Sequence, residues 1–197
     1  MLVAVRTGIL GGTFDPIHIA HLHAAECAKH QLSLDRVLVV PAGDPWQKAD
    51  RRVSSDEDRV AMCRLAVEGS DGLEVDEREV RRGGPTYTID TLASFPENEE
   101  LFLIVGGDAA AGIHTWHRWE EVLTRAKVVI IPRPGHPTGD LPGSIVVEMG
   151  ALEVSGTEIR NRAAGRRPFR YLVTQRVYEY IISHNLYEND RQDDMVG

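Results

Sequence analysis

Cysteine is scarce in this chain, which argues against a fold held by disulfides and against a cysteine metal site. Only Cys27 and Cys63 occur in 197 residues, and both fall in segments with a helical pattern and without the spacing of a metal site. A chain of this length can bury roughly 70% of its unfolded surface, so it needs no disulfide to hold a core together. The two residues are therefore interpreted as ordinary reduced thiols in a reducing compartment.

An excess of basic residues and long apolar runs are missing as well. The formal net charge is −8, which argues against nucleic-acid binding because that requires a cationic face. Phosphate ligands remain compatible, since they need only a few positive groups in one cleft. No stretch approaches the ~20 apolar residues of a membrane span, and residues 1–10 resemble a first strand more than a signal peptide. We expect a cytoplasmic protein without membrane or nucleic-acid partners, and a homo-oligomer is compatible with the composition.

Strand-like and helical segments alternate along the chain. Strands are predicted at 3–10, 37–40, 73–75, 101–105, 127–131 and 144–147. Helices are predicted at 19–31, 55–68, 86–94, 155–164 and 174–185, with one or two more within 109–123. Continuously apolar strands between helices predict an α/β fold, a Rossmann-like parallel sheet with helices on both faces. Ligands of such sheets bind at the carboxyl ends of the strands.

Residues 1–187 are expected to form one domain, and the polar tail 188–197 to be disordered. Two long loops, 41–54 and 132–143, are expected to be functional or mobile.

The first candidate site follows the first predicted strand. Gly11 and Gly12 allow a backbone to approach a phosphate closely, and a helix N-terminus with its partial positive charge follows. His18 and His21 are three residues apart, so on a helix they share a face and would point toward a bound anion, with stronger hydrogen bonds if protonated. The residues alone leave other interpretations open, because such a turn is common and paired histidines can bind a metal or face solvent.

The second candidate site is the segment 154–160. Ser155 and Glu158 have the spacing of a capping box, which favours a plain capped helix. The alternative is a second helix N-terminus that collects phosphate, with Arg160 as a forked donor.

Together the two motifs resemble the nucleotidylyltransferase superfamily. The Gly-Thr-Phe-Asp-Pro turn with its His-x-x-His pair is similar to the superfamily signature, and the preceding Gly-Gly resembles the branch that uses nicotinate mononucleotide. Residues 154–160 resemble its Ile-Ser-Ser-Thr-x-x-Arg motif, with Gly156 at the third position. Ala20 stands where the family usually has glycine, and we expect it to be tolerated if the backbone there is helical.

The resemblance extends over about residues 7 to 187 and implies roles for further residues. Residues 82–92 resemble the segment that receives the nicotinate ring and its carboxylate, although a plain helix cap at Thr86 or Thr88 is an alternative. Trp116 is expected to stack on the ring, whereas Trp119 is expected to be a core anchor. In the loop after the second strand the family usually ends in Pro-His-Lys, and Gln47 departs from that pattern, so only Lys48 carries over.

The implied site residues fall into three sets. The catalytic set is His18, His21, Lys48 and Arg160. The ATP-binding set is Gly11, Gly12, Thr13, Phe14, His18, His21, Gly106, Asp108 on a ribose, Ser155, Thr157 and Arg160. The set that binds nicotinate mononucleotide is Thr86, Tyr87, Thr88 and Trp116.

The resemblance implies transfer of AMP from ATP to nicotinate mononucleotide, forming nicotinate adenine dinucleotide and pyrophosphate in NAD biosynthesis. The attacking phosphate has a second pKa of ~6 and is largely ionised at neutral pH, so no general base is needed. Without a carboxylate cluster we expect no built-in metal site, and Mg²⁺ would arrive with ATP.

Other functions remain as alternatives. A pantetheine-phosphate adenylyltransferase would share both phosphate motifs, but we would not expect it to contain the segments 86–92 and 108–119. A preference for nicotinamide mononucleotide depends on few contacts. A nucleotide-binding regulator without turnover is disfavoured by the two histidines, Lys48 and Arg160. A flavodoxin-like structural module would require several motif matches in order by chance.

Overall fold

The computed structural model describes residues 4–43, 53–132 and 141–188. The strands are β1 (Arg6–Gly12), β2 (Arg36–Pro41), β3 (Leu73–Val75), β4 (Glu100–Gly106), β5 (Ala126–Ile131) and β6 (Ile145–Val146). The helices are α1 (Ile19–Gln31), α2 (Asp56–Val67), α3 (Arg78–Arg82), α4 (Thr88–Ala93), α5 (Gly107–Ala111), α6 (Trp119–Arg125), α7 (Gly156–Ala164) and α8 (Gln175–Ser183), with short 3₁₀ turns η2 (Ile113–Thr115) and η3 (Arg170–Leu172). No helix in these ranges is long and apolar enough to cross a membrane.

The strands form one parallel sheet in the order β3-β2-β1-β4-β5-β6. The order reverses between β1 and β4, which are neighbours although they are far apart in the chain. Such a reversal leaves a crevice beyond the carboxyl ends of the two strands, which is where ligands of doubly wound sheets bind. The predicted Rossmann-like α/β fold is therefore confirmed.

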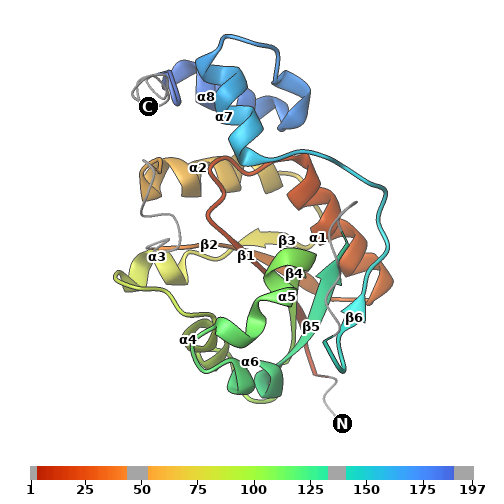
Figure 1. Cartoon of the computed structure of the whole chain (residues 1–197). Coiled ribbons are helices and arrows are strands. Elements are labelled where there is room, and N and C mark those ends of the chain that lie inside the picture. Colours follow the sequence, from red (N-terminus) through yellow and green to blue (C-terminus); the bar gives the residue numbers. More distant parts are fainter. Residues whose placement is uncertain (1–3, 44–52, 133–140, 189–197) are drawn as a thin grey trace.

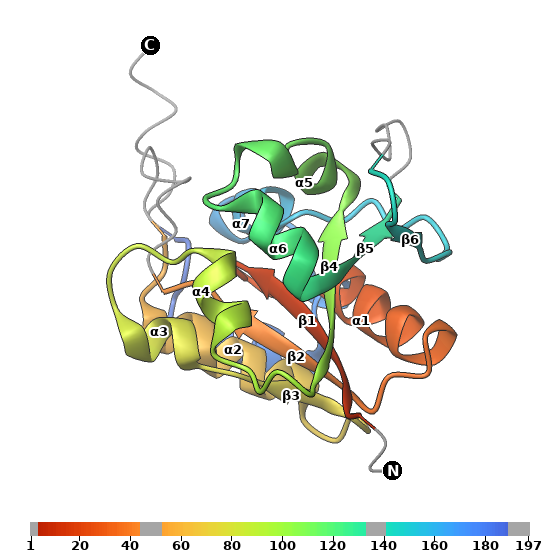
Figure 2. The same ribbon diagram turned by 90° about the horizontal axis from the view of Figure 1, so that it is seen from below.

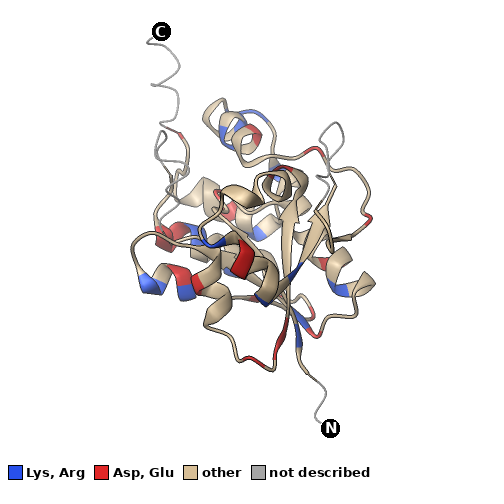
Figure 3. Ribbon diagram, turned by 60° about the horizontal axis from the view of Figure 1, so that its bottom comes forward, with Lys and Arg blue, Asp and Glu red and all other residues tan. Residues whose placement is uncertain are grey.

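Helices cover both faces of the sheet (Figures 1 and 2). Alternate strand residues point to opposite faces, so Leu10 and Ile104 pack with α1, α2 and α8, whereas Ile9 and Val105 pack with α4, α5 and α6. Positive and negative residues are interspersed along the ribbon (Figure 3). The two apolar clusters thus cover the two faces of the sheet and leave the carboxyl ends of the strands available to a ligand.

Several boundaries differ from those predicted. The first strand was predicted at 3–10 but runs from Arg6 to Gly12, because Gly11 and Gly12 still pair with β2. The helix predicted at 86–94 begins at Thr88, and α3 was not predicted at all. The segment within 109–123 divides into α5, η2 and the start of α6.

Two expectations about single residues are tested by the fold. Ala20 is the second residue of α1 and has no positive φ, so an alanine methyl fits where the family usually has glycine. Both cysteines are free, and burial raises the pKa of the Cys63 thiol to about 12. A buried, protonated thiol is unreactive, in agreement with an ordinary structural role.

Candidate functional site

A cavity of about 360 Å³ opens at the carboxyl ends of β1 and β4, where the strand order reverses. Its wall combines the end of β1, α1, the segment after β2, α3, the start of α4, and the end of β4 with the residues that follow η2. The predicted site residues in this wall are Gly11, Gly12, Thr13, His21, Thr86, Tyr87, Thr88, Gly106 and Trp116. A larger groove of about 810 Å³ lies among α7, η3 and α8, but no strand end opens into it.

The turn between β1 and α1 is shaped by close packing around Phe14. A Cβ at Gly12 would lie 2.9 Å from the Phe14 ring, so only glycine fits there without movement. Phe14 itself has φ 50°, a left-handed conformation that is uncommon outside glycine. Its ring meets the His21 ring edge-on at 5.1 Å. The Phe14 ring therefore packs against the His21 imidazole, and the missing side chain at Gly12 leaves space for the Phe14 ring.

His18 and His21 differ in their burial and in their position relative to α1. His18 is the N-cap of α1 in extended backbone and its side chain is buried, whereas His21 lines the cavity. Their rings stack with centroids 3.7 Å apart. His18 precedes the helix and its ring lies against His21, so the two residues do not share a helix face, and the contact of both with a bound anion stays a prediction.

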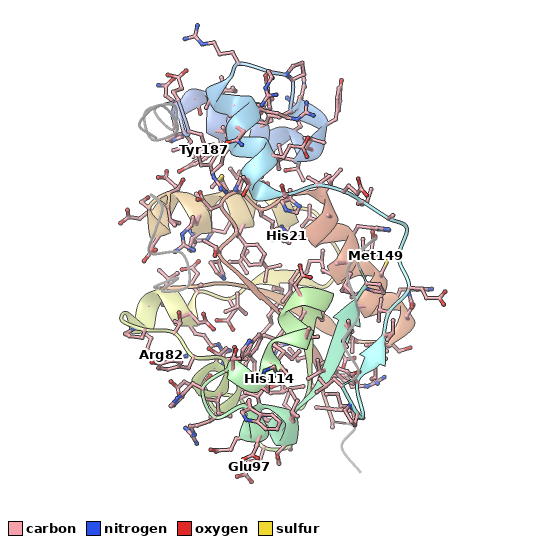
Figure 4. The ribbon with its side chains drawn as sticks, viewed as in Figure 1. His21, Arg82, Glu97, His114, Met149 and Tyr187 are labelled. Atoms are coloured by element: carbon pink, nitrogen blue, oxygen red, sulfur yellow. The ribbon has the colours of Figure 1, made fainter. Side chains whose placement is uncertain are left out.

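The backbone of His18 also fixes the orientation of His21. The His18 N–H donates to Nδ1 of His21 over 3.3 Å. In the neutral imidazole one ring nitrogen accepts and the other donates, so this bond favours the tautomer with hydrogen on Nε2. Figure 4 shows His21 at the end of α1 that lies nearest to α7. The site thus offers a fixed N–H donor to a ligand in the cavity.

Arg160 joins α7 to the same turn from outside the cavity. Its Nη1 donates to the Asp15 carbonyl over 2.7 Å and its Nη2 to Thr157 Oγ1 over 3.1 Å. A Cβ at Gly156 would lie 3.1 Å from that carbonyl oxygen, so a larger residue there would require a small shift of the turn. Ser155 caps the helix, with Oγ accepting from the Glu158 N–H. Ser155, Thr157 and Arg160 therefore adjoin the turn but do not line the 360 Å³ cavity.

Tyr187 holds the turn from the far end of the chain. Its hydroxyl donates to Asp15 Oδ1 over 2.9 Å, and both side chains are buried. Burial, with the Asp15 carboxylate beside it, raises the pKa of the Tyr187 phenol. The phenol therefore stays protonated and remains a hydrogen-bond donor, so one side chain fixes the carboxylate while Arg160 fixes the carbonyl of the same residue.

The opposite wall of the cavity is formed by Tyr87 and its neighbours. Tyr87 is the N-cap of α4 and makes no side-chain cap bond, so neither Thr86 nor Thr88 caps this helix. The Tyr87 ring lies 4.4 Å from the ring of His117, a cavity residue that no sequence motif indicated. Trp116 is partly buried against the core and lines the cavity. This wall thus presents aromatic surface beside the start of a helix.

Two more predicted residues, Asp108 and Trp119, do not line the cavity. Asp108 is exposed in the first turn of α5 and does not line the cavity. Trp119, expected to be a core anchor, is only partly buried at the first position of α6. Lys48 falls outside the described residues.

Glu79 is a cavity residue that sequence reasoning missed. It lies on α3 and accepts a hydrogen bond from Thr91 Oγ1 over 2.6 Å, and Arg82 in turn donates to that oxygen over 3.3 Å. Burial raises the pKa of Glu79, partly offset by the hydrogen bond from Thr91. The signal for it was weak, because α3 spans five residues and carries no buried apolar position.

Substitution Glu79→Gln is expected to stabilise the protein more at pH 8 than at pH 4. Because the folded pKa is raised, the stability linked to Glu79 is present below the unfolded pKa and is lost as the pH rises through the folded value. Glutamine removes that loss. The Tm of both proteins at both pH values tests this, with Glu97→Gln as an exposed control (Figure 4). A variant that gains less at pH 8 than at pH 4 would contradict the expectation.

Metal-binding clusters are absent from the part of the chain that the structure describes: no three or more His, Cys, Asp or Glu side chains converge there. Mg²⁺ prefers oxygen ligands and keeps several waters, so it can be held mainly by the phosphates of a nucleotide.

Comparisons with known proteins agree in one family. Residues 9–162 match the cytidylyltransferase-like family model. The probable nicotinate-nucleotide adenylyltransferase of Corynebacterium kroppenstedtii is 44% identical, over 92% of this chain and 90% of that protein. That of Acidothermus cellulolyticus is 43% identical, over 92% and 94%. The solved structure of Plasmodium falciparum nicotinic acid mononucleotide adenylyltransferase complexed with NaAD covers 93% of this chain and 97% of its own with a TM-score of 0.77, and at 19% identity it supports the fold.

Proposed function

The chain belongs to the cytidylyltransferase-like family and, within it, to the nicotinate-nucleotide adenylyltransferases. We propose that ATP and nicotinate mononucleotide bind in the cavity, where the AMP part of ATP is joined to the mononucleotide. The products are nicotinate adenine dinucleotide and pyrophosphate. The observation that carries the proposal is that His21, Thr86–Thr88 and Trp116 share one cavity at the reversal of strand order.

The reaction needs positioning and charge stabilisation more than proton transfer. The phosphate of the mononucleotide, with a second pKa of ~6, is largely ionised at neutral pH and attacks the α-phosphorus of ATP in line. The P–O bond to pyrophosphate breaks as the new one forms, so no general base is required. Fixed donors aimed at the developing charge lower the barrier. Mg²⁺ would be held mainly by the phosphates of ATP and would supply additional charge neutralisation.

Each side chain has a proposed role in this scheme. His21 donates from Nε2 to the α-phosphate, and His18 orients it through the backbone bond and ring stacking. Arg160, with Lys48, contacts the β- and γ-phosphates, and backbone groups of Gly12–Phe14 and Thr157 complete the cradle. Gly106 and Asp108 are assigned to the nucleotide, with Asp108 on a ribose. The start of α4 receives the nicotinate carboxylate, because a helix N-terminus favours an anion.

The test of this function is steady-state pyrophosphate release with ATP and Mg²⁺. Nicotinate mononucleotide, nicotinamide mononucleotide and phosphopantetheine are compared as acceptors. We expect a preference of about tenfold or more for the nicotinate form, equivalent to roughly 1.4 kcal/mol of discrimination. A preference for another acceptor would overturn the assignment of nicotinate mononucleotide as the substrate. No turnover with any of the three acceptors would favour the alternative of a nucleotide-binding regulator without catalytic activity.

Substitution Trp116→Ala is expected to raise the KM for nicotinate mononucleotide more than the KM for ATP. The partly buried indole lines the cavity beside Tyr87, and removing it takes away a stacking surface for the pyridine ring. Initial rates at varied concentration of each substrate measure the two constants. Trp119→Ala is the control, since that side chain does not line the cavity. A larger rise for ATP would remove Trp116 from the acceptor pocket.

Cytoplasmic location stays a prediction from the sequence, which does not decide between a monomer and a homo-oligomer. The oligomeric state is open to measurement by light scattering on the purified protein.

A further inference from the structure

Arg59 is a charged side chain in the interior. It lies on α2 with 0% of its surface exposed, among the buried neighbours Val60, Met62 and Cys63. An arginine is almost never fully buried unless its charge and donors are satisfied, because removing a charged group from water carries a large free-energy cost. Its contacts should therefore indicate what the buried charge does.

The guanidinium connects three segments. Its Nη1 donates to the Thr13 carbonyl over 2.8 Å. Its Nη2 donates to the Ala42 carbonyl over 2.6 Å and, more weakly, to the Gly43 carbonyl over 3.4 Å. The same nitrogen forms an ion pair with Asp56 at the start of α2. One side chain thus joins the β1–α1 turn, the segment after β2 and the helix that follows.

These bonds set the direction of the peptide groups in the turn. Thr13 and Ala42 line the cavity, whereas Arg59 is fully buried, so the carbonyl oxygens that it binds point inward. A trans peptide is planar with its C=O and N–H on opposite sides, so the Phe14 N–H points away from Arg59. Phe14 also has φ 50°, a conformation of order 1 kcal/mol less favourable that surrounding contacts must hold.

We propose that Arg59 is a positioning residue for adenylyl transfer, which turns the carbonyl oxygens of Thr13 and Ala42 inward so that the turn presents N–H groups to the ATP triphosphate. The inference rests on the proposed function. Arg59 does not touch the nucleotide in this scheme. It keeps two carbonyl dipoles from facing an anion, and its ion pair with Asp56, which is 47% exposed, holds the guanidinium in that position.

Arg125 provides a matched control elsewhere in the fold. At the end of α6, its guanidinium also donates to three carbonyl oxygens, those of Phe95, Pro96 and Glu99, over 3.4, 2.7 and 3.2 Å. None of these residues lines the cavity. A substitution of Arg125 therefore removes a similar set of bonds without altering the turn.

The test compares Arg59→Lys with Arg125→Lys. Lysine keeps the charge but loses the planar fork that reaches several carbonyls. Both variants are expected to have a lower Tm, but only Arg59→Lys should raise the KM for ATP, by about tenfold, roughly the loss of one hydrogen bond to a charged group. An equal change of KM in the two variants, or none in Arg59→Lys, overturns the proposal.

A binding measurement separates this inference from the proposed function. Calorimetry with α,β-methylene-ATP and Mg²⁺ reports affinity for the triphosphate whether or not the acceptor is correct. We expect the Kd to rise about tenfold in Arg59→Lys and to stay within about twofold in Arg125→Lys. If the wild-type protein binds the analogue but shows no turnover, only the proposed function is contradicted. If a folded Arg59→Lys protein binds the analogue as tightly as the wild type, only the inference about Arg59 is contradicted.

If Arg59→Lys does not fold, two variants that keep Arg59 in place test the same proposal. Asp56→Asn weakens the ion pair that holds the guanidinium, and Glu57→Gln removes an exposed charge from the same helical turn. We expect Asp56→Asn to weaken binding of the analogue by about threefold, within the range for a partly exposed pair. Equal affinities in the two variants would overturn the proposal.

Discussion

Substitution His21→Ala is expected to lower kcat by ~100-fold or more while leaving the protein folded, the size of effect seen when a transition-state donor is removed. His21 lines the cavity, and its Nδ1 accepts from the His18 N–H, so Nε2 is the nitrogen that can donate to the reacting phosphate. Steady-state pyrophosphate release at saturating substrates, with Tm measured in parallel, tests the expectation.

His23 supplies the control for this substitution. It lies two residues further along α1, where its ring contacts Cys27 Sγ at 3.7 Å and borders a different hollow. His23→Ala should therefore keep turnover within about threefold, as expected for a surface site without a special role. Near-wild-type turnover in a folded His21→Ala protein would remove His21 from the reaction.

Substitution Arg160→Ala is expected to lower kcat/KM for ATP by ~100-fold and to lower the Tm as well. The guanidinium holds the Asp15 carbonyl and Thr157 together across the junction of α7 with the β1–α1 turn. Removing it leaves a buried carbonyl without this donor, which costs about 1–3 kcal/mol, and deletes a positive charge near the proposed triphosphate site. Initial rates at varied ATP and thermal unfolding measure the two effects.

Arg162 is the corresponding control on the same helix. Its side chain is 36% exposed and pairs with Glu158, and such pairs contribute about 0–1 kcal/mol. Arg162→Ala should therefore change kcat/KM for ATP by no more than a few-fold. If the two variants lose activity equally, Arg160 acts only by stabilising α7 and its assignment to the phosphates fails.

The sheet could be predicted because its strands are short apolar runs. Helix α1 begins and ends at the residues predicted, and β3 does so as well. Strand ends and helix starts are local features, so the glycines, His21 and the start of α4 could be placed near one edge before the structure was known. Boundaries failed where pairing extends beyond the apolar run, as at Gly11 and Gly12, which remain hydrogen-bonded to β2.

Arg59 and Glu79 show what local pattern cannot reveal. Arg59 follows three acidic residues in the first turns of α2, a pattern typical of a solvated helix face, and only the convergence of distant carbonyls makes its burial favourable. Glu79 becomes a wall residue because it meets Thr91 of α4 through a hydrogen bond, and α3 is too short to show helical periodicity. His18 precedes the predicted helix 19–31, and local pattern did not show that its ring would stack on His21.

The contact between Tyr187 and Asp15 also bears on the order in which the protein can mature during synthesis. Asp15 is made early, but the hydroxyl that binds it belongs to a residue 172 positions later, and Arg160 joins the same turn only 145 residues after Asp15. The sheet strands precede both, so a nascent chain can pair its strands while this turn still lacks its two late partners and α8 has not yet covered its face of the sheet. On the ribosome, the turn between β1 and α1 is therefore among the last parts of the described fold to gain all its contacts.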